Sequence, residues 1–284
     1  MIEARNITFS SGGKSILRPV SLSLDRAEMV VILGPNGAGK STLLQILAGL
    51  FSATSGTVAY GTRELASWDI TELARQRAYL HQHNNVFGAF TVEDILEMGR
   101  YPYFDMKPSE GDKQLVEEAI RDMELGSRRT QVYQTLSGGE QQRIQFARAI
   151  LQLQDPKETR LDNKVLFLDE PLNNLDLHYQ YALMWQARQK IVEKGGTVVA
   201  VLHDINMAYQ FADRIIILKE GNVVVDDATE KALDPEVLSS IFEVEVRKIA
   251  ITEKEAFFST RPLAVDKENE TEKIAGKLSG NFKI

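Results

Sequence analysis

The sequence has no cysteine and no long apolar run, and each absence removes a class of protein. Without cysteine there is no disulfide framework and no thiolate-bound metal, which fits a reducing cytoplasm. The longest apolar runs, such as 29–33 and 215–218, are far shorter than the roughly 20 residues that a membrane-spanning helix needs. We therefore expect a chain that does not cross a bilayer by itself. The first residues, MIEARNITFS, also lack the apolar stretch of a secretory signal.

A concentrated positive charge is missing as well. The formal net charge is −7 over 284 residues, and the lysines and arginines are scattered. Because phosphate-backbone binding needs a clustered basic surface, we expect no nucleic-acid partner. A chain of this length can bury a sizeable core in one or two domains.

Short runs rich in β-branched residues alternate with helical patterns. They lie at 29–33, 165–168, 197–202 and 214–218. Runs that are apolar on both faces are typical of parallel strands covered by helices. The first three runs end at polar clusters, and ligands of such sheets bind where the strands end, so we expect these clusters to form one site.

Three further segments complete the predicted organisation. The turn at 219–222 leads from the last run into a hairpin with 222–226. Residues 92–124 read as a separate helical lobe, with breaks at Tyr101-Pro102 and Lys107-Pro108. The polar stretch at 266–284 is expected to be mobile.

A glycine-rich turn, GPNGAGKST, follows the first run immediately. It matches G-x-x-x-x-G-K-[ST], in which backbone N–H groups and a helix N-terminus face phosphate oxygens. Its residues are Gly34, Pro35, Asn36, Gly37, Ala38, Gly39, Lys40, Ser41 and Thr42. We expect Lys40 to neutralise the β- and γ-phosphates and Ser41 to offer a hydroxyl to magnesium, with the hydroxyl of Thr42 nearby. The alternative is an ordinary turn before a helix, and the preceding strand and following apolar periodicity disfavour it.

Two adjacent carboxylates end the second run, in VLFLDEPLNNLD. Because side chains alternate across a strand, Asp169 and Glu170 cannot both face one ion from an extended backbone. We expect Asp169 to hold magnesium beside Ser41, and Glu170 to orient or deprotonate the attacking water. A helix-capping pair after a strand is the alternative, and the neighbouring phosphate motif disfavours it.

The octamer LSGGEQQR begins a further helix with a serine and two glycines, which makes a second site for an anion. The residues that we assign to this site are Leu136, Ser137, Gly138, Gly139, Glu140 and Gln141. The alternative is a capped helix with no further role. Ordinary P-loop proteins carry the two preceding motifs but not this octamer, so it discriminates between families. One polypeptide cannot readily use two phosphate sites for a single nucleotide.

Together with Gln82 in AYLHQHN and His203 in VLHDIN, these motifs resemble those of the ATP-binding cassette (ABC) ATPases over about residues 2–246. P-loop kinases and GTPases lack the octamer. The resemblance implies an α/β fold: a P-loop NTPase cassette with a mostly parallel core sheet, an N-terminal antiparallel β region and a helical lobe. We expect a single domain at 1–250 with the lobe at about 84–135, and a partly mobile C-terminal extension at 251–284.

The resemblance also implies the chemistry of the site. The cofactors are ATP and Mg²⁺, and two copies of the chain form a head-to-tail dimer in which LSGGE of one copy meets the ATP on the other. Gln82 matches the glutamine that touches magnesium and the attacking water. His203 matches the histidine that holds the γ-phosphate and Glu170, although a lone histidine after a strand is more often an ordinary polar residue. Asp176 matches the aspartate that communicates across the dimer.

Two positions depart from the family pattern. An aromatic residue commonly stacks on adenine near the start of the chain, and Ser10-Ser11 occupy that place here. Phe9 either stacks on the base or fills the core, and its strand-like setting favours the core. Asn173-Asn174 stand where Thr-Ser is more usual, and we expect function to be kept with altered contacts.

The resemblance extends to importers. The segments at 90–95 and 97–103 resemble the branch serving haem, ferric siderophores and cobalamin. Together with VLHDIN and MGRYPY, the polar insertion QDPKETRLDN resembles the haem-import ATPases, although a tolerated surface loop explains the insertion more simply. We expect two integral-membrane permease subunits, an indirectly coupled substrate-binding protein and a peripheral place on the cytoplasmic face of the inner membrane.

Other functions stay open at this point. Ferric siderophore and cobalamin are alternative cargoes, because a cytoplasmic ATPase need not touch what is transported. A non-transport cassette, such as a scaffold ATPase of iron–sulfur assembly, fits the same architecture. A translation factor is disfavoured by the single cassette and the acidic charge, and a repair ATPase by the lack of a long coiled coil.

Overall fold

The computed structural model describes residues 2–82, 86–104, 106–252 and 255–263, which belong to two compact units. The first unit ends at Ala232 and the second begins at Leu233. All the candidate site residues belong to the first unit. The stretch at 266–284 that we expect to be mobile lies outside the described residues.

The first unit is built on a six-stranded sheet in the order β10-β9-β3-β8-β7-β6. Five neighbouring strands are parallel, and β10 pairs antiparallel with β9 at one edge. The strands are β3 (Met29–Leu33), β6 (Arg77–Leu80), β7 (Val165–Asp169), β8 (Thr197–Val201), β9 (Arg214–Lys219) and β10 (Asn222–Ala228). The four predicted runs and the predicted hairpin are confirmed. Every residue of β3, β7 and β8 is buried, which explains their continuous apolar pattern.

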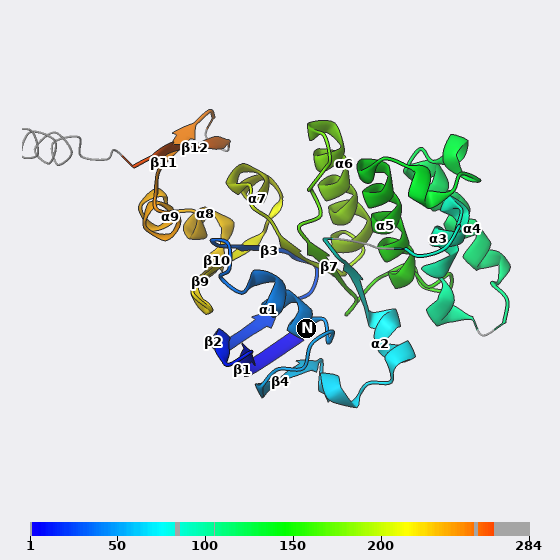
Figure 1. Ribbon diagram of the computed structural model, residues 1–284, viewed down its shortest axis with the longest axis horizontal. Helices are drawn as coiled ribbons and strands as arrows, with labels where there is room; N and C mark the ends of the chain where they lie inside the picture. The colour runs from blue at the N-terminus through cyan, green and yellow to red at the C-terminus, as the bar shows by residue number, and fades with distance from the viewer. Residues whose placement is uncertain (1, 83–85, 105, 253–254, 264–284) are drawn as a thin grey trace, which may run out of the picture. The chain divides into compact units, whose positions relative to one another are not determined.

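A second, antiparallel sheet has the order β2-β1-β4-β5, and it confirms the predicted N-terminal β region. Its strands are β1 (Ile2–Ser11), β2 (Lys14–Leu24), β4 (Ser55–Tyr60) and β5 (Arg63–Glu64). Helix α1 (Lys40–Leu47) lies between the two sheets (Figure 1). The buried leucines of α1 join side chains from both sheets in one hydrophobic core. Burial on both sides fixes α1 at the ends of the parallel strands.

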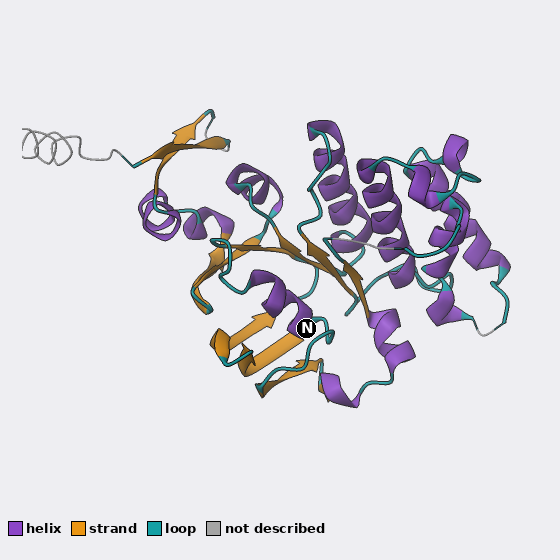
Figure 2. Ribbon diagram, viewed as in Figure 1, coloured by secondary structure: helices purple, strands orange, loops and turns teal. Residues whose placement is uncertain are grey.

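The face of the parallel sheet opposite α1 is covered by helices, and more helices extend it into a lobe (Figure 2). These helices are α2 (Ile70–Gln76), α3 (Val92–Met98), α4 (Glu110–Asp122), α5 (Gly138–Leu153), α6 (Leu177–Ala187), α7 (Ile205–Phe211) and α8 (Thr229–Ala232). A short 3-10 turn at Tyr101–Tyr103 separates α3 from α4, as the prolines predict. Within the described ranges, no helix combines the length and apolar composition that crossing a membrane requires.

The second unit consists of α9 (Pro235–Phe242) and a hairpin of β11 (Val244–Ala250) and β12 (Ala256–Pro262). The hydroxyl of Ser239 in α9 accepts a hydrogen bond from the N–H of Val246, at 2.9 Å. Val246 and Phe258 are the buried apolar residues of the hairpin.

A buried ion pair joins three helices of the lobe. Arg100 and Asp112 are 1% and 3% exposed, and Nη2 of Arg100 is 2.8 Å from Oδ1 of Asp112. Arg100 also donates to the carbonyls of Leu151 and Gln154 at the end of α5. Asp112 at the same time caps α4, because its other oxygen accepts from the N–H and hydroxyl of Ser109. The pair therefore fixes the ends of α3 and α5 against the start of α4.

Replacing Asp112→Ala should lower the free energy of unfolding by about 3–5 kcal/mol, because Arg100 is left as an unpaired buried charge. The matched control is Asp94→Ala, which removes the same capping interaction from α3 but touches no buried arginine. It should cost about 1 kcal/mol. Urea unfolding of both variants, followed by circular dichroism, measures the difference, and equal losses would contradict this role of the pair.

Candidate active site

The glycine-rich turn between β3 and α1 has a conformation that other residues cannot adopt. Gly34 has a φ of 146°, and a Cβ added there would lie 2.1 Å from the carbonyl oxygen of Leu218 in β9. Gly39, directly before α1, has a φ of 97°. The turn therefore packs tightly against β9 while its backbone N–H groups lead into the positive end of α1, which is the arrangement that binds phosphate.

Lys40, the first residue of α1, is folded over this turn. Its Nζ donates to the carbonyl oxygens of Gly34 and Pro35, at 2.8 and 3.0 Å. Burial lowers the pKa of Lys40, although the carboxylates of Glu170 and Asp169 act in the opposite direction. The ammonium group thus lies inside the turn, where a phosphate would meet it.

A cavity of about 600 Å³ opens in front of the turn. It is lined by Lys14, Ser15, Ile16, Arg18, Asn36, Gly37, Ala38, Gly39, Lys40, Ser41, Thr42, Glu170 and Glu220. Its volume is in the range of small-molecule and cofactor sites. Seven of these residues come from the predicted phosphate motif, so the cavity lies where the sequence predicts the nucleotide site.

Asp169 is the last residue of β7 and only 4% exposed. Its Oδ1 accepts a hydrogen bond from the hydroxyl of Ser41 at 2.8 Å, and its Oδ2 accepts one from the hydroxyl of Tyr79 at 2.9 Å. A carboxylate beside a serine hydroxyl is the hard-oxygen donor set that Mg²⁺ prefers. In the described part of the chain, no group of three or more His, Cys, Asp or Glu residues could hold a metal ion.

Glu170 leaves the strand direction, with a φ of 49°, and its carboxylate has different partners. Nε2 of His203 lies 2.8 Å from Oε1. Oε2 accepts from the amides of Gln82 and Asn173, at 2.6 and 2.8 Å. Burial raises the pKa of Glu170, but hydrogen bonds from His203 and Asn173 outweigh it, so the pKa lies below its ordinary value. The structure thus brings Gln82 and His203 together on an ionised Glu170.

The LSGGE segment is separate from this cavity. Ser137 caps α5, and Oε2 of Glu140 accepts from the N–H and the hydroxyl of Ser137 at 2.9 and 2.7 Å. The amide of Gln141 donates to the carbonyls of Tyr133 and Leu136. Among the described residues that line the P-loop cavity, none belongs to 136–141.

The segment after Glu170 turns sharply before α6. Asn174 has a φ of 62°, a left-handed conformation that asparagine tolerates better than most residues. Asp176 caps α6, because its Oδ1 accepts from the N–H of Tyr179 at 3.1 Å. The two residues that replace the more usual Thr-Ser therefore have different structural roles. Asn173 donates a hydrogen bond to Glu170, and Asn174 forms the turn.

Phe9 packs beside the hydrophobic core and stacks on Phe51, with ring centroids 5.7 Å apart and an interplanar angle of 11°. It does not line the described cavity, which agrees with the core interpretation. From the segment that follows Ser10-Ser11, the residues that line the cavity are Lys14, Ser15, Ile16 and Arg18.

Comparison with known families agrees with this geometry. A family model described as ABC transporter matches residues 17–173. The chain belongs to the ABC transporter family. This ABC protein is 42% identical over 245 residues to a hemin import ATP-binding protein from Rhodopseudomonas palustris, covering 86% of this chain and 91% of the relative. It is 37% identical over 246 residues to the protein of the same name from Escherichia coli, covering 87% and 93% of the two chains.

Solved structures share the ABC cassette fold. A dimeric bacterial ABC transporter cassette is 30% identical, with a TM-score of 0.68, and the match covers 81% of this chain and 99% of that one. An inward-facing metal-chelate type ABC transporter is similar in fold at 24% identity, with a TM-score of 0.73 and coverage of 94% and 98%. These matches confirm the predicted P-loop cassette with its parallel core sheet.

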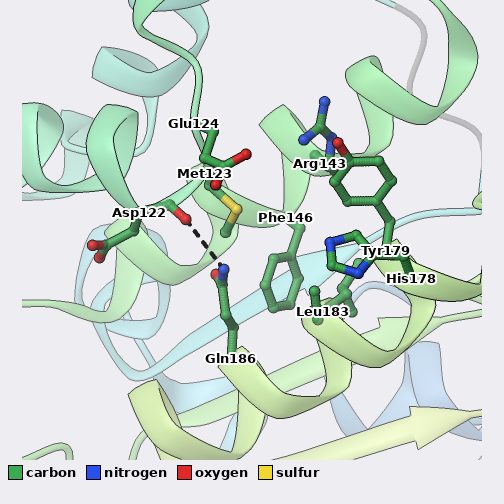
Figure 3. Close-up of a pocket in the computed structure, with 10 residues that line it drawn as sticks. Asp122, Met123, Glu124, Arg143, Phe146, His178, Tyr179, Leu183 and Gln186 are labelled. Carbon is green, nitrogen blue, oxygen red and sulfur yellow. Dashed lines mark hydrogen bonds between the residues drawn. The ribbon is translucent and has the colours of Figure 1, made fainter.

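In this ABC protein the LSGGE helix α5 is tied to α6, which follows Asp176. A small cavity of about 110 Å³ lies between α4, α5 and α6, and Arg143 lies over the ring of Tyr179 at 4.0 Å on one side of it (Figure 3). On the other side the amide of Gln186 donates to the carbonyl of Asp122. The first contact joins α5 to α6, and the second joins α6 to the end of α4.

Sequence reasoning missed two polar contacts of the site. Tyr79 reads as one more aromatic residue of a buried strand, and nothing in the pattern shows that its hydroxyl reaches Asp169. At Asn173 the sequence shows only a departure from the residue that is usual in the family. It does not indicate that the Asn173 amide donates to Glu170. Both contacts depend on the tertiary arrangement and have no local signal.

Lys40→Ala should weaken ATP binding about 10- to 100-fold, because a charge-assisted hydrogen bond to phosphate contributes about 1.5–3 kcal/mol. Isothermal titration calorimetry of the full chain measures the change. Lys231→Ala, at an exposed lysine of the same unit, serves as the control and should leave the affinity as it is. An unchanged affinity in Lys40→Ala would contradict the assignment.

Proposed function

We propose that this chain is the ATP-hydrolysing subunit of an ABC importer that takes up haem. The observation that carries the ATPase assignment is the position of Glu170, held by Gln82, Asn173 and His203 at the edge of the P-loop cavity. The cargo assignment is supported by identities of 37–42% to proteins named hemin import ATP-binding proteins. Ferric siderophore and cobalamin are the alternative cargoes.

In the proposed reaction Glu170 acts as the general base. Its carboxylate is ionised, so it accepts a hydrogen bond from the attacking water and orients or deprotonates it beside the γ-phosphate. His203 keeps Glu170 in place and contacts the γ-phosphate, while Gln82 is free to exchange between Glu170 and the water. A positioned base of this kind contributes roughly 10²–10⁴ in rate.

The phosphates are held by the turn at 34–39, by the N-terminal end of α1, by the ammonium of Lys40 and by the adjacent Thr42 hydroxyl. The residues that would hold Mg²⁺ are Ser41 and Asp169, with Gln82 as a third, weaker ligand. When bound, the ion would neutralise the charge on the β- and γ-phosphate oxygens.

The active form we propose is a head-to-tail dimer of two copies. The P-loop cavity of one chain lacks any donor from its own LSGGE segment among its described lining residues. The corresponding segment of the second copy, Leu136 to Gln141, would close the site, with Asp176 at the contact between copies. A dimeric cassette at 30% identity supports this arrangement.

The remaining partners follow from the importer assignment. Two integral-membrane permease subunits would bind near the helical lobe, and a substrate-binding protein would deliver the cargo to them from the other side. The chain would then work as a peripheral subunit on the cytoplasmic face of the inner membrane.

Glu170→Gln should keep ATP binding and lower turnover by about 100-fold or more, because the amide cannot accept the proton of water. ATP should then trap the dimer, visible as an earlier peak in size-exclusion chromatography. Glu72→Gln, at an exposed carboxylate paired with Arg63, is the matched control and should hydrolyse ATP normally. Full activity in Glu170→Gln would refute the base assignment.

The cargo is tested by purifying the chain with its membrane partners and measuring uptake into proteoliposomes. Haem should accumulate only when ATP is present on the side of this chain, and Glu170→Gln should abolish uptake. Preferential uptake of a ferric siderophore or cobalamin would correct the cargo. Recovery of only non-membrane partners, such as iron–sulfur assembly proteins, would contradict the importer assignment itself.

A further inference from the structure

The carboxylate of Asp169 has two oxygens with two different donors. Oδ1 accepts from the hydroxyl of Ser41 at the start of α1, and Oδ2 accepts from the hydroxyl of Tyr79 in β6. Because each donor comes from another part of the fold, the two hydrogen bonds together fix the rotation of the carboxylate. Oδ1 is directed to the P-loop and Oδ2 is directed to β6.

Tyr79 is itself held firmly. It is 5% exposed and lies opposite Phe167 in the parallel pairing of β6 with β7. Its ring centroid is 6.4 Å from that of Phe167, at an interplanar angle of 29°, and 4.5 Å from that of His81. The ring is thus packed between neighbours, and its hydroxyl donates to Oδ2 of Asp169.

The same strand leads to Gln82. Tyr79 contacts Asp169, and Gln82 lies three positions later in the chain. The side-chain amide of Gln82 donates to Glu170 at 2.6 Å. One short segment therefore contacts both neighbouring carboxylates, each through a different side chain. A shift of β6 or of its C-terminal end would change the surroundings of Asp169 and Glu170 together.

We propose that Tyr79 is a positioning residue for the divalent cation that accompanies the nucleotide. Its hydroxyl keeps Oδ1 of Asp169 turned toward Ser41, and it links this carboxylate to β6, the strand that precedes Gln82. The ligand class is a divalent cation bound together with a nucleoside triphosphate. The inference rests on the proposed function only in that the P-loop cavity binds such a complex, and it does not require hydrolysis.

Tyr79→Phe is the direct test, because it keeps the stacked ring and removes only the hydroxyl. The magnesium concentration that gives half-maximal binding of a non-hydrolysable ATP analogue should rise about 10-fold, the lower end of what loss of a partner behind a metal ligand costs. Binding of the analogue in EDTA should be unchanged, since Lys40 and the turn at 34–39 are intact. Calorimetric titrations of the full chain at a series of magnesium concentrations measure both quantities.

Tyr60→Phe is the matched control. Tyr60 is also a buried tyrosine, 6% exposed, but its hydroxyl donates to the carbonyl of Leu47 at 2.8 Å. The variant removes a buried hydroxyl of the same kind away from Asp169, so the magnesium requirement should stay at the wild-type value.

Three results would overturn the proposal. The first is an unchanged magnesium midpoint in Tyr79→Phe, and the second is an equal shift of the midpoint in Tyr79→Phe and Tyr60→Phe. The third is a loss of analogue binding by Tyr79→Phe in EDTA that is as large as its loss with magnesium. The first result would mean that the Tyr79 hydroxyl contributes only to core packing. The other two would mean that the variant weakens binding through a general loss of structural stability. A wild-type chain that binds no analogue with magnesium would contradict the ATPase proposal as well. A wild-type chain that binds the analogue but hydrolyses no ATP would contradict only the ATPase proposal.

Discussion

The hydrogen bond between Ser41 and Asp169 joins residues 128 positions apart, and the rest of the site depends on the sheet that makes this contact possible. Strands β3, β8 and β7 are neighbours and parallel, so the segments that follow them emerge at one edge. β3 delivers the phosphate turn, β7 delivers Asp169 and Glu170, and β8 between them delivers His203. Complete burial of the three strands fixes their register, and the register fixes which side chains meet at the edge.

The helical lobe contacts the segment that follows Glu170. Its LSGGE segment lies at the start of α5, close to the turn after Glu170: a Cβ at Gly139 would be 3.2 Å from the carbonyl oxygen of Asn174. The amide of Gln142 donates to the carbonyl of Pro171 in the same region. The lobe is thus attached to the Glu170 segment of its own chain, while residues 136–141 are not among the described residues that line the P-loop cavity. The chain therefore contains every component of the proposed site, but its P-loop cavity and its LSGGE segment lie at different places on the first unit.

Much of this arrangement could be predicted from the sequence, because the phosphate turn, the strands and the capped helices have local signals. Met29–Leu33 and the eight residues from Leu136 are examples, since pattern and conformation are set within a few positions. Contacts between distant polar groups have no such signal. The hydroxyl of Tyr79, the amide of Asn173 and the buried Arg100 could be assigned only from the structure.

The hairpin of β11 and β12 escaped prediction for a related reason. The last four residues of β11 are exposed, the charged Arg247 and Lys248 and the apolar Ile249 and Ala250, and Val246 is its single fully buried residue. The alternation of apolar and polar side chains that predicts a half-buried strand is therefore weak. β11 packs mainly against β12 and α9, so its own sequence has little of the apolar pattern by which a strand is predicted.

The capping box at the start of α5 means that the LSGGE segment is already occupied in the isolated chain. Glu140 accepts from both the N–H and the hydroxyl of Ser137, the donors that would face an incoming phosphate in the proposed dimer. In the proposed dimer the nucleotide therefore competes with a carboxylate that is tethered three residues away and present at high effective concentration. Such competition would weaken the closed dimer, because the open state regains the hydrogen bonds between Ser137 and Glu140.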